Sequence, residues 1–170
     1  MRSAYSCIVR PEEGRTTSVK DVDGQELMLN TELQKHQYVS RSGIVLETPI
    51  MGDSKIQKGD NIIVHNNVFR RFYDVRGEEK NSASYYKEDK FFCYPDQVFL
   101  YKSIESDWKA LEGFCFVKPL ESQDELSLAK EHALKGVVKY LDDGLENSGI
   151  TKGDIVGFTP GSDCLLYTFD

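Results

Sequence analysis

Apolar positions occur along this chain in short runs of β-branched and aromatic residues, each bounded by Gly, Pro, Asp or Asn. Runs of this kind are typical of strands in small antiparallel barrels. We expect strands at residues 7–9, 42–47, 60–65, 69–75, 90–94 and 97–102, and then at 113–118, 136–141, 154–158 and 164–169. In contrast, Leu126, Ala129 and Ala133 recur at helical spacing, which predicts one short helix over residues 124–135.

Three short motifs occur twice along the chain, in the same order. They are CIVRP at 7–11 with CFVKP at 115–119, SGIV at 42–45 with KGVV at 135–138, and IQKGDNI at 56–62 with ITKGDIV at 150–156. Such an ordered set of matches indicates two copies of one module, which we place at residues 1–105 and 106–170. Each Lys-Gly-Asp predicts a tight turn in which the glycine has a positive φ.

The first copy is the longer of the two. From Cys7 to Gly43 the chain advances 36 residues, whereas the equivalent step from Cys115 to Gly136 takes 21. The additional residues lie in 12–38, a polar segment that contains one compact apolar triplet, Leu27-Met28-Leu29. We therefore expect a long loop at 12–38, and an exposed hairpin or loop at 75–90, which is also polar.

The order of these motifs resembles that of GroES-type co-chaperonins. The features that carry the resemblance are a strand ending in Val-Arg-Pro or Val-Lys-Pro, a loop, a Gly-Ile-Val or Gly-Val-Val strand, and Lys-Gly-Asp before an apolar strand. The resemblance implies a mainly β fold of two tandem, small and irregular GroES-like barrels. The first would carry the loop 12–38, and the second, shorter barrel would contain the one short helix.

The same resemblance implies a function and a site. The chain would be a non-catalytic co-chaperonin whose homo-oligomeric ring caps an ATP-bound GroEL-type chaperonin and assists protein folding. Loop 12–38 would be mobile, with Leu27, Met28 and Leu29 docking in an apolar groove of the chaperonin. Alternatively, this triplet packs on the barrel and is followed by a helix over 31–37. A tandem, divergent version of this kind would suit a bacteriophage, acting in the host cytoplasm.

A different class of function fits the duplicated barrels equally well. They could be packing units of a structural or assembly protein, such as a phage virion or adaptor component, because a fold does not determine a function.

The composition excludes several classes of protein. The 170 residues include 21 basic and 28 acidic side chains, which gives a net charge of −7, and 39% are apolar, as in a globular protein. No apolar run approaches the roughly 18–20 residues that a membrane helix needs. The first residues have no apolar core of a secretory signal, so we expect a cytoplasmic protein. Its four cysteines show no metal-binding spacing and are predicted to be reduced, buried small hydrophobes.

Candidate chemistry is sparse. His36, His65 and His132 lie in different contexts and match no metal or catalytic-triad spacing, and no nucleotide-binding or nucleophile motif occurs. We therefore expect no enzymatic activity, no metal and no cofactor. The basic and aromatic run at 69–73 could contact nucleic acid, but the net charge of −7 argues against it. The alternative is that the arginine stems cover the rim of the barrel.

Overall fold

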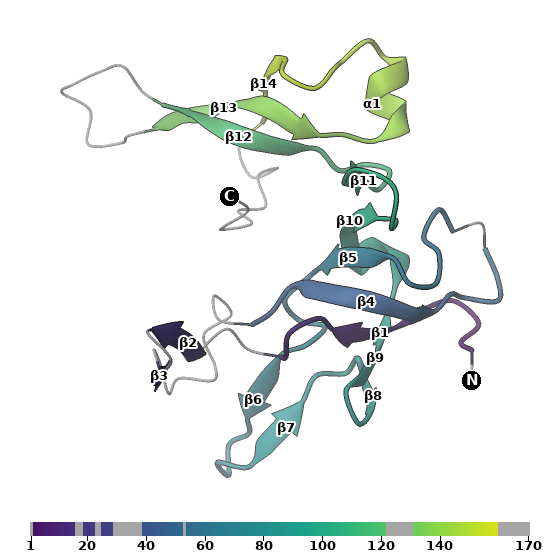
Figure 1. Cartoon of the computed structure of the whole chain (residues 1–170), viewed down its shortest axis with the longest axis vertical. Helices are drawn as coiled ribbons and strands as arrows, with labels where there is room; N and C mark the ends of the chain where they lie inside the picture. Colours follow the sequence, from purple (N-terminus) through teal and green to yellow (C-terminus); the bar gives the residue numbers. More distant parts are fainter. Residues whose placement is uncertain are drawn as a thin grey trace. The chain divides into compact units, whose positions relative to one another are not determined.

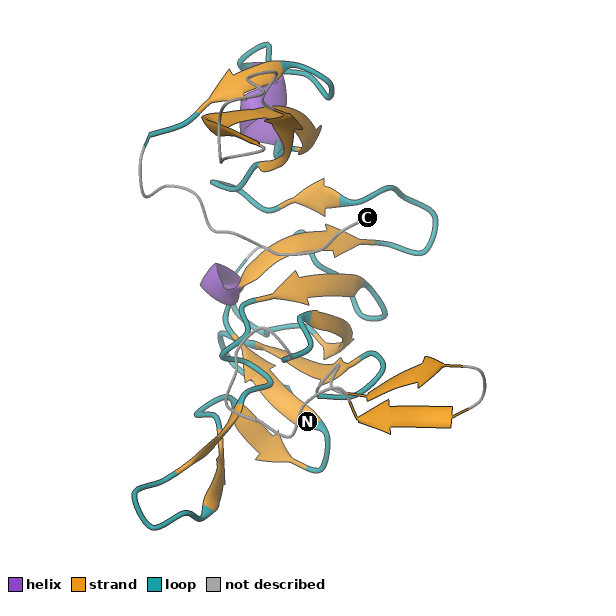
Figure 2. Ribbon diagram, turned by 90° about the vertical axis from the view of Figure 1, so that its left-hand side faces the viewer, coloured by secondary structure: helices purple, strands orange, loops and turns teal. Residues whose placement is uncertain are grey.

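The computed structural model describes residues 2–15, 19–22, 25–28, 39–52, 54–121 and 131–159. The described part of the chain is mainly strand, which confirms the predicted mainly β class (Figure 2). The chain divides after Trp108 into two compact units, residues 1–108 and 109–170, which are described separately below. None of the helices in the described ranges is long and apolar enough to cross a membrane.

The first unit is built on antiparallel strands hydrogen-bonded in the order β10-β5-β4-β1-β9-β8 (Figure 1). Their bounds are β1 Cys7–Pro11, β4 Ser42–Glu47, β5 Asn61–Val64, β8 Tyr85–Lys87, β9 Lys90–Cys93 and β10 Val98–Lys102, the last preceded by a 3-10 turn, η2, at Pro95–Gln97. Two hairpins form separate sheets: β2 Val19–Val22 with β3 Gln25–Met28, and β6 Arg71–Tyr73 with β7 Glu79–Asn81. The described sheets are not closed, so the barrel remains a prediction.

Consecutive residues of β1, β5 and β10, together with the turn that follows β5, form the core of the first unit. Phe69 and Phe91 are almost fully buried, and their rings meet edge to face with centroids 5.1 Å apart. Such pairs contribute about 0.5–1.5 kcal/mol beyond the area they bury. Around them lie the buried aliphatic side chains Val9, Val45, Ile62, Val64, Val68, Val98 and Leu100.

The second unit has a three-stranded antiparallel sheet in the order β12-β13-β14. Its elements are β11 Lys109–Ala110, β12 Phe116–Glu121, β13 Glu131–Tyr140, α1 Asp143–Asn147 and β14 Ile155–Gly157. The Ala110 N–H donates to the Leu141 carbonyl at 3.3 Å, which ties β11 to the end of β13.

The predicted helix at 124–135 is wrong for residues 131–135, which belong to β13; residues 124–130 lie outside the described ranges. Cross-strand pairing with β12, which extends to Glu121 opposite Glu131, overrides the helical propensity of this segment. The described α-helix lies instead at 143–147, where the Asp142 carboxylate caps it by accepting the Leu145 N–H at 2.8 Å.

The repeated motifs fold into equivalent three-stranded sheets. Strands β1, β4 and β5 correspond to β12, β13 and β14, and the residues that pair within this three-stranded unit have equivalent partners in the two copies. The equivalent pairs are Val9–Val45 and Val117–Val138, Arg10–Ile44 and Lys118–Val137, Pro11–Gly43 and Pro119–Gly136, and Gly43–Ile62 and Gly136–Val156. Both copies also have a register irregularity just before the repeated valine of the first strand. The two copies therefore share strand order, register and a local distortion.

Both Lys-Gly-Asp turns have the predicted geometry. Gly59 and Gly153 have φ values of 93° and 99°, which confirms the expected positive φ. The following aspartates close each turn: Asp60 accepts the Gln57 N–H at 2.8 Å, and Asp154 accepts the Thr151 N–H at 2.7 Å. The third strand of each copy begins directly after this turn, at Asn61 in β5 and at Ile155 in β14.

The equivalent cysteines differ in exposure. Cys7 is buried, as is its cross-strand partner Cys93, whereas Cys115, the counterpart of Cys7, is exposed. The prediction of buried cysteines is therefore right for Cys7 and Cys93 and wrong for Cys115, because no described strand covers β12 where β9 covers β1. Cys164 lies outside the described residues.

Alanine at Gly43 or Gly136 should destabilise the protein. A Cβ at Gly43 would lie 3.0 Å from the Arg10 carbonyl oxygen and 3.0 Å from Cζ of Phe69, and one at Gly136 would lie 2.8 Å from the Val117 Cβ. We expect each substitution to lower the free energy of unfolding by about 1–3 kcal/mol in urea titrations followed by circular dichroism. Gly144→Ala is the matched control, because its nearest neighbouring atom is 3.5 Å away. Equal stability of Gly43→Ala and Gly144→Ala would contradict the close packing.

Alkylation should distinguish the cysteines. Burial raises the pKa of the Cys7 thiol to about 11 and also raises the pKa of Cys93 strongly, so neither forms much of the reactive thiolate at pH 8. The pKa of Cys115 is also raised, by partial burial and by nearby Asp142, but its side chain is exposed. Iodoacetamide followed by peptide mass mapping should label Cys115 well before Cys7 and Cys93. Simultaneous labelling of all three in the native protein would be inconsistent with this burial.

Candidate functional site

The two ends of the predicted docking loop, residues 12–38, are held close together on the first unit. The Ser40 N–H donates to the Arg15 carbonyl at 3.0 Å, and the Glu12 N–H donates to the Ser42 carbonyl at 3.2 Å. The Ser42 hydroxyl also donates to the Glu12 carboxylate. The residues that flank segment 16–38 therefore lie next to each other beside the start of β4.

The Arg15 side chain anchors this base. Its guanidinium donates to the Asn81 side-chain oxygen at 2.7 Å, to the Phe69 carbonyl at 3.2 Å and to the Arg70 carbonyl at 3.4 Å. It also lies over the Phe91 ring, 4.9 Å from the centroid. A planar guanidinium can donate in several directions and stack on a ring at once, which an ammonium cannot do.

The electrostatics of Arg15 follow from this position. Burial and the nearby Arg71 lower the pKa of Arg15, while Asp89 and Glu79 act in the opposite direction. Arginine remains protonated despite such a shift, so the base of the loop keeps one positive charge packed against the aromatic core.

Within the loop, β2 and β3 form a hairpin that pairs with no other described strand. Val19 lies opposite Met28, Lys20 opposite Leu27, and Val22 opposite Gln25. The sequence between Val22 and Gln25 is Asp23-Gly24, a dipeptide favoured in two-residue hairpin connections.

The predicted docking triplet is thus divided. Leu27 and Met28 lie at the end of β3, whereas Leu29 lies outside the described residues, as does the alternative helix at 31–37.

The other sequence candidates do not converge on one site. The His65 ring packs near Phe99, accepts the Asn67 N–H at 3.1 Å, and has its pKa lowered by burial and by Arg41. His36 lies outside the described residues, and His132 lies within β13. In the described part of the chain, no three His, Cys, Asp or Glu side chains gather as a potential metal site.

The basic and aromatic run at 69–73 is split between the interior and the surface. Phe69 is 1% exposed, whereas Phe72 and Tyr73 are about 40% exposed on β6, where Arg71 pairs with Glu79 at 2.9 Å. The five residues therefore do not form one continuous basic and aromatic surface.

Sequence reasoning missed Arg15 as the anchor of the loop. Its partners are backbone carbonyls and a side chain 54 to 66 residues away, so no local pattern marks it.

No protein-family model, curated protein or solved structure matches this chain.

Arg15→Lys should loosen the base of the loop. Lysine keeps the charge but loses the directed bonds and the stacking, so we expect the free energy of unfolding to fall by about 1–3 kcal/mol in urea titrations. The Ser40 amide should exchange its hydrogen faster, because its acceptor is the Arg15 carbonyl. Arg76→Lys, on the exposed tip of the β6–β7 hairpin, should change stability by less than about 0.5 kcal/mol. An Arg15→Lys protein as stable as this control would refute the anchoring role.

Proposed function

We propose that this protein is a co-chaperonin of GroES type that docks on an ATP-bound GroEL-type chaperonin through residues 12–38. It acts without catalysis, as a homo-oligomer, and its two copies of the three-stranded module are divergent GroES-like barrels. The observation that carries the proposal is the loop itself: a long polar segment with an apolar triplet, which starts and ends at one anchored point of a β unit.

The anchored base suits reversible docking. Because Arg15 and Ser40 hold the two ends, the β2–β3 hairpin can engage a groove without disturbing the sheet that carries it. A single short apolar segment binds weakly, since ordering it costs free energy. Several loops on one ring would bind tightly, because each further contact becomes intramolecular at a high effective concentration.

Residues Leu27 and Leu29 provide the test. The double variant Leu27→Ala with Leu29→Ala should abolish ATP-dependent co-migration with a GroEL-type chaperonin in native mass measurements, while the melting temperature stays within about 1 °C. Ile104→Ala is the matched control: it removes an apolar side chain that is 90% exposed elsewhere in the first unit, and it should leave binding unchanged.

Two results would overturn the docking role. One is a wild-type chain that ignores the chaperonin at every nucleotide condition. The other is a loss of several degrees in the melting temperature of the double variant, because this would identify the leucines as packed core residues.

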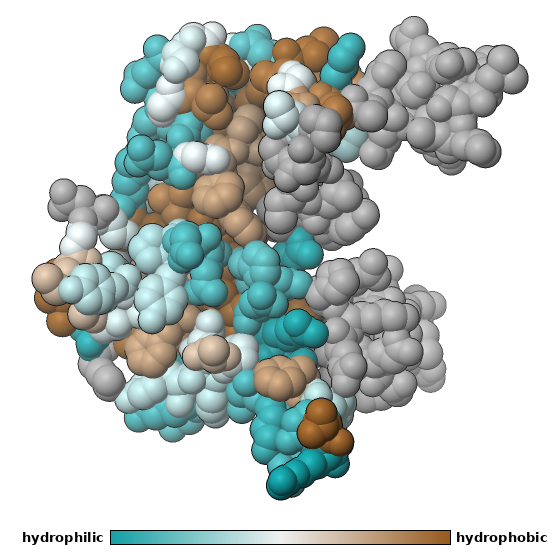
Figure 3. All heavy atoms as spheres, turned by 180° about the vertical axis from the view of Figure 1, so that it is seen from behind, coloured by the Kyte–Doolittle hydropathy of each residue, from teal (hydrophilic) through white to brown (hydrophobic). Residues whose placement is uncertain are grey.

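An assembly role is the second candidate, and exposed apolar side chains favour it. Val75 is fully exposed and Ile104 is 90% exposed, and hydrophobic residues reach the surface in the view of Figure 3. Residues of this kind are what subunits bury against one another. A stable assembly that forms without chaperonin, and whose mass falls in Ile104→Ala or Val75→Ala, would favour this function over the first.

A further inference from the structure

We propose that the outer edge of β12 in the second unit binds an extended partner segment in which acidic and apolar residues alternate. The segment would add to the sheet as an antiparallel strand. The inference rests on the comparison of the two copies of the module, and it is independent of the docking function of residues 12–38.

In the first unit, the edge equivalent to that of β12 is paired with another strand. There, β1 is covered on its outer side by β9, with Cys7 opposite Cys93, Ile8 opposite Phe92 and Val9 opposite Phe91. In the second unit, β12 is the counterpart of β1, and its described pairing is with β13 alone. The three residues equivalent to those covered by β9 are Cys115, Phe116 and Val117.

Burial follows the same contrast. Cys7, Ile8 and Val9 are at most 4% exposed, whereas Cys115 is exposed and both Phe116 and Val117 are partly exposed. An edge strand with unpaired backbone groups and apolar side chains is a template for strand addition. Pro119, which has no N–H, limits the pairing edge to the residues before it.

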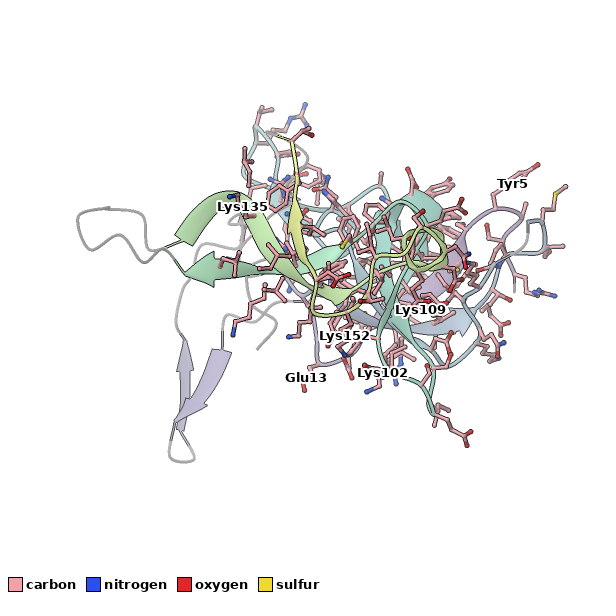
Figure 4. All side chains as sticks on the ribbon, turned by 90° about the horizontal axis from the view of Figure 1, so that it is seen from above. Tyr5, Glu13, Lys102, Lys109, Lys135 and Lys152 are labelled. Carbon is pink, nitrogen blue, oxygen red and sulfur yellow. The ribbon has the colours of Figure 1, made fainter. Side chains whose placement is uncertain are left out.

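The two faces of the sheet give the partner its chemistry. Residues that pair directly lie on the same face and neighbours along β12 alternate between faces, so Val117 and Val138 share one face, whereas Phe116, Lys118 and Val137 lie on the other. Lys135 lies two residues before Val137 in β13, so it belongs to the same face as Val137 and Lys118 (Lys135 is labelled in Figure 4). Lys118 and Lys135 are both exposed.

The acidic residues of these two strands lie at the other end of the pair, where Glu121 is opposite Glu131. One face of this edge therefore carries Cys115 and Val117, and the opposite face carries Phe116 and Lys118, with Lys135 on the neighbouring strand. A strand with alternating residues places every second side chain on one face. Its apolar side chains would meet Cys115 and Val117, and its carboxylates would meet the lysine face.

The first experiment uses a fluorescein-labelled seven-residue peptide in which glutamate alternates with valine, titrated with the full chain and followed by anisotropy. We expect saturable binding, and binding at least tenfold weaker for the same peptide with lysine in place of glutamate. Two further peptides carry N-methyl groups on one or the other set of alternate amides. Because only one set can face β12, one of these peptides should lose binding and the other should keep it.

Charge reversal locates the site. The double variant Lys118→Glu with Lys135→Glu should weaken binding of the glutamate peptide by about tenfold. Lys152→Glu is the matched control in the same unit, because Lys152 lies in the turn before β14, which is separated from the edge strand β12 by β13. This variant should bind at least five times more tightly than the double variant.

Hydrogen exchange completes the test. Amides of 115–117 should exchange much faster than those of 7–9 in the free chain, and the peptide should slow them. Three outcomes would each overturn the proposal: equal binding of the two N-methylated peptides, equal binding of the lysine peptide, or 115–117 already protected as well as 7–9 in the free chain. The last would mean that another segment of the chain covers this edge.

Discussion

The close approach of backbone at Gly43 and Gly136 is the constraint on which both copies of the module depend. A side chain at either position would meet the carbonyl oxygen of the neighbouring strand at 3.0 Å. The glycine therefore fixes how near the first strand can lie to the middle strand. The Lys-Gly-Asp turn then fixes the third strand from the opposite side, since the amide of its glycine donates to the middle strand at 2.8 or 2.9 Å. In the first unit, the further strands β9 and β10 pair with the outer strands β1 and β5 of this three-stranded unit.

The sequence predicts this unit well because its signals are local. Each of the six runs predicted in the first unit overlaps a strand, and the run at 42–47 has the predicted bounds. The duplicated motifs mark residues with equivalent partners. A glycine turn or a strand with alternating apolar residues can be predicted from a few neighbouring residues. The helix predicted over 124–135 failed at 131–135 because pairing with β12 comes from outside that window.

The candidate site was harder to predict for the same reason. The apolar triplet at 27–29 is visible as a local contrast with its polar surroundings, whereas the role of Arg15 depends on Phe69, Asn81 and Phe91, all more than 50 residues away. The uncovered edge of β12 is likewise invisible in its own sequence, since CFVKP differs little from CIVRP. It becomes evident only when the partners of both copies are compared.

The anchored base at Arg15 and Ser40 also has a consequence for how this protein can change over time. Because a backbone hydrogen bond of 3.0 Å joins the Ser40 N–H to the Arg15 carbonyl, the entropic cost of closing the segment between them depends only weakly on its length. Doubling the length of such a segment costs only about 0.6 kcal/mol. Insertions and deletions between these two residues, outside Leu27-Met28-Leu29, would therefore accumulate while the sheet stays intact.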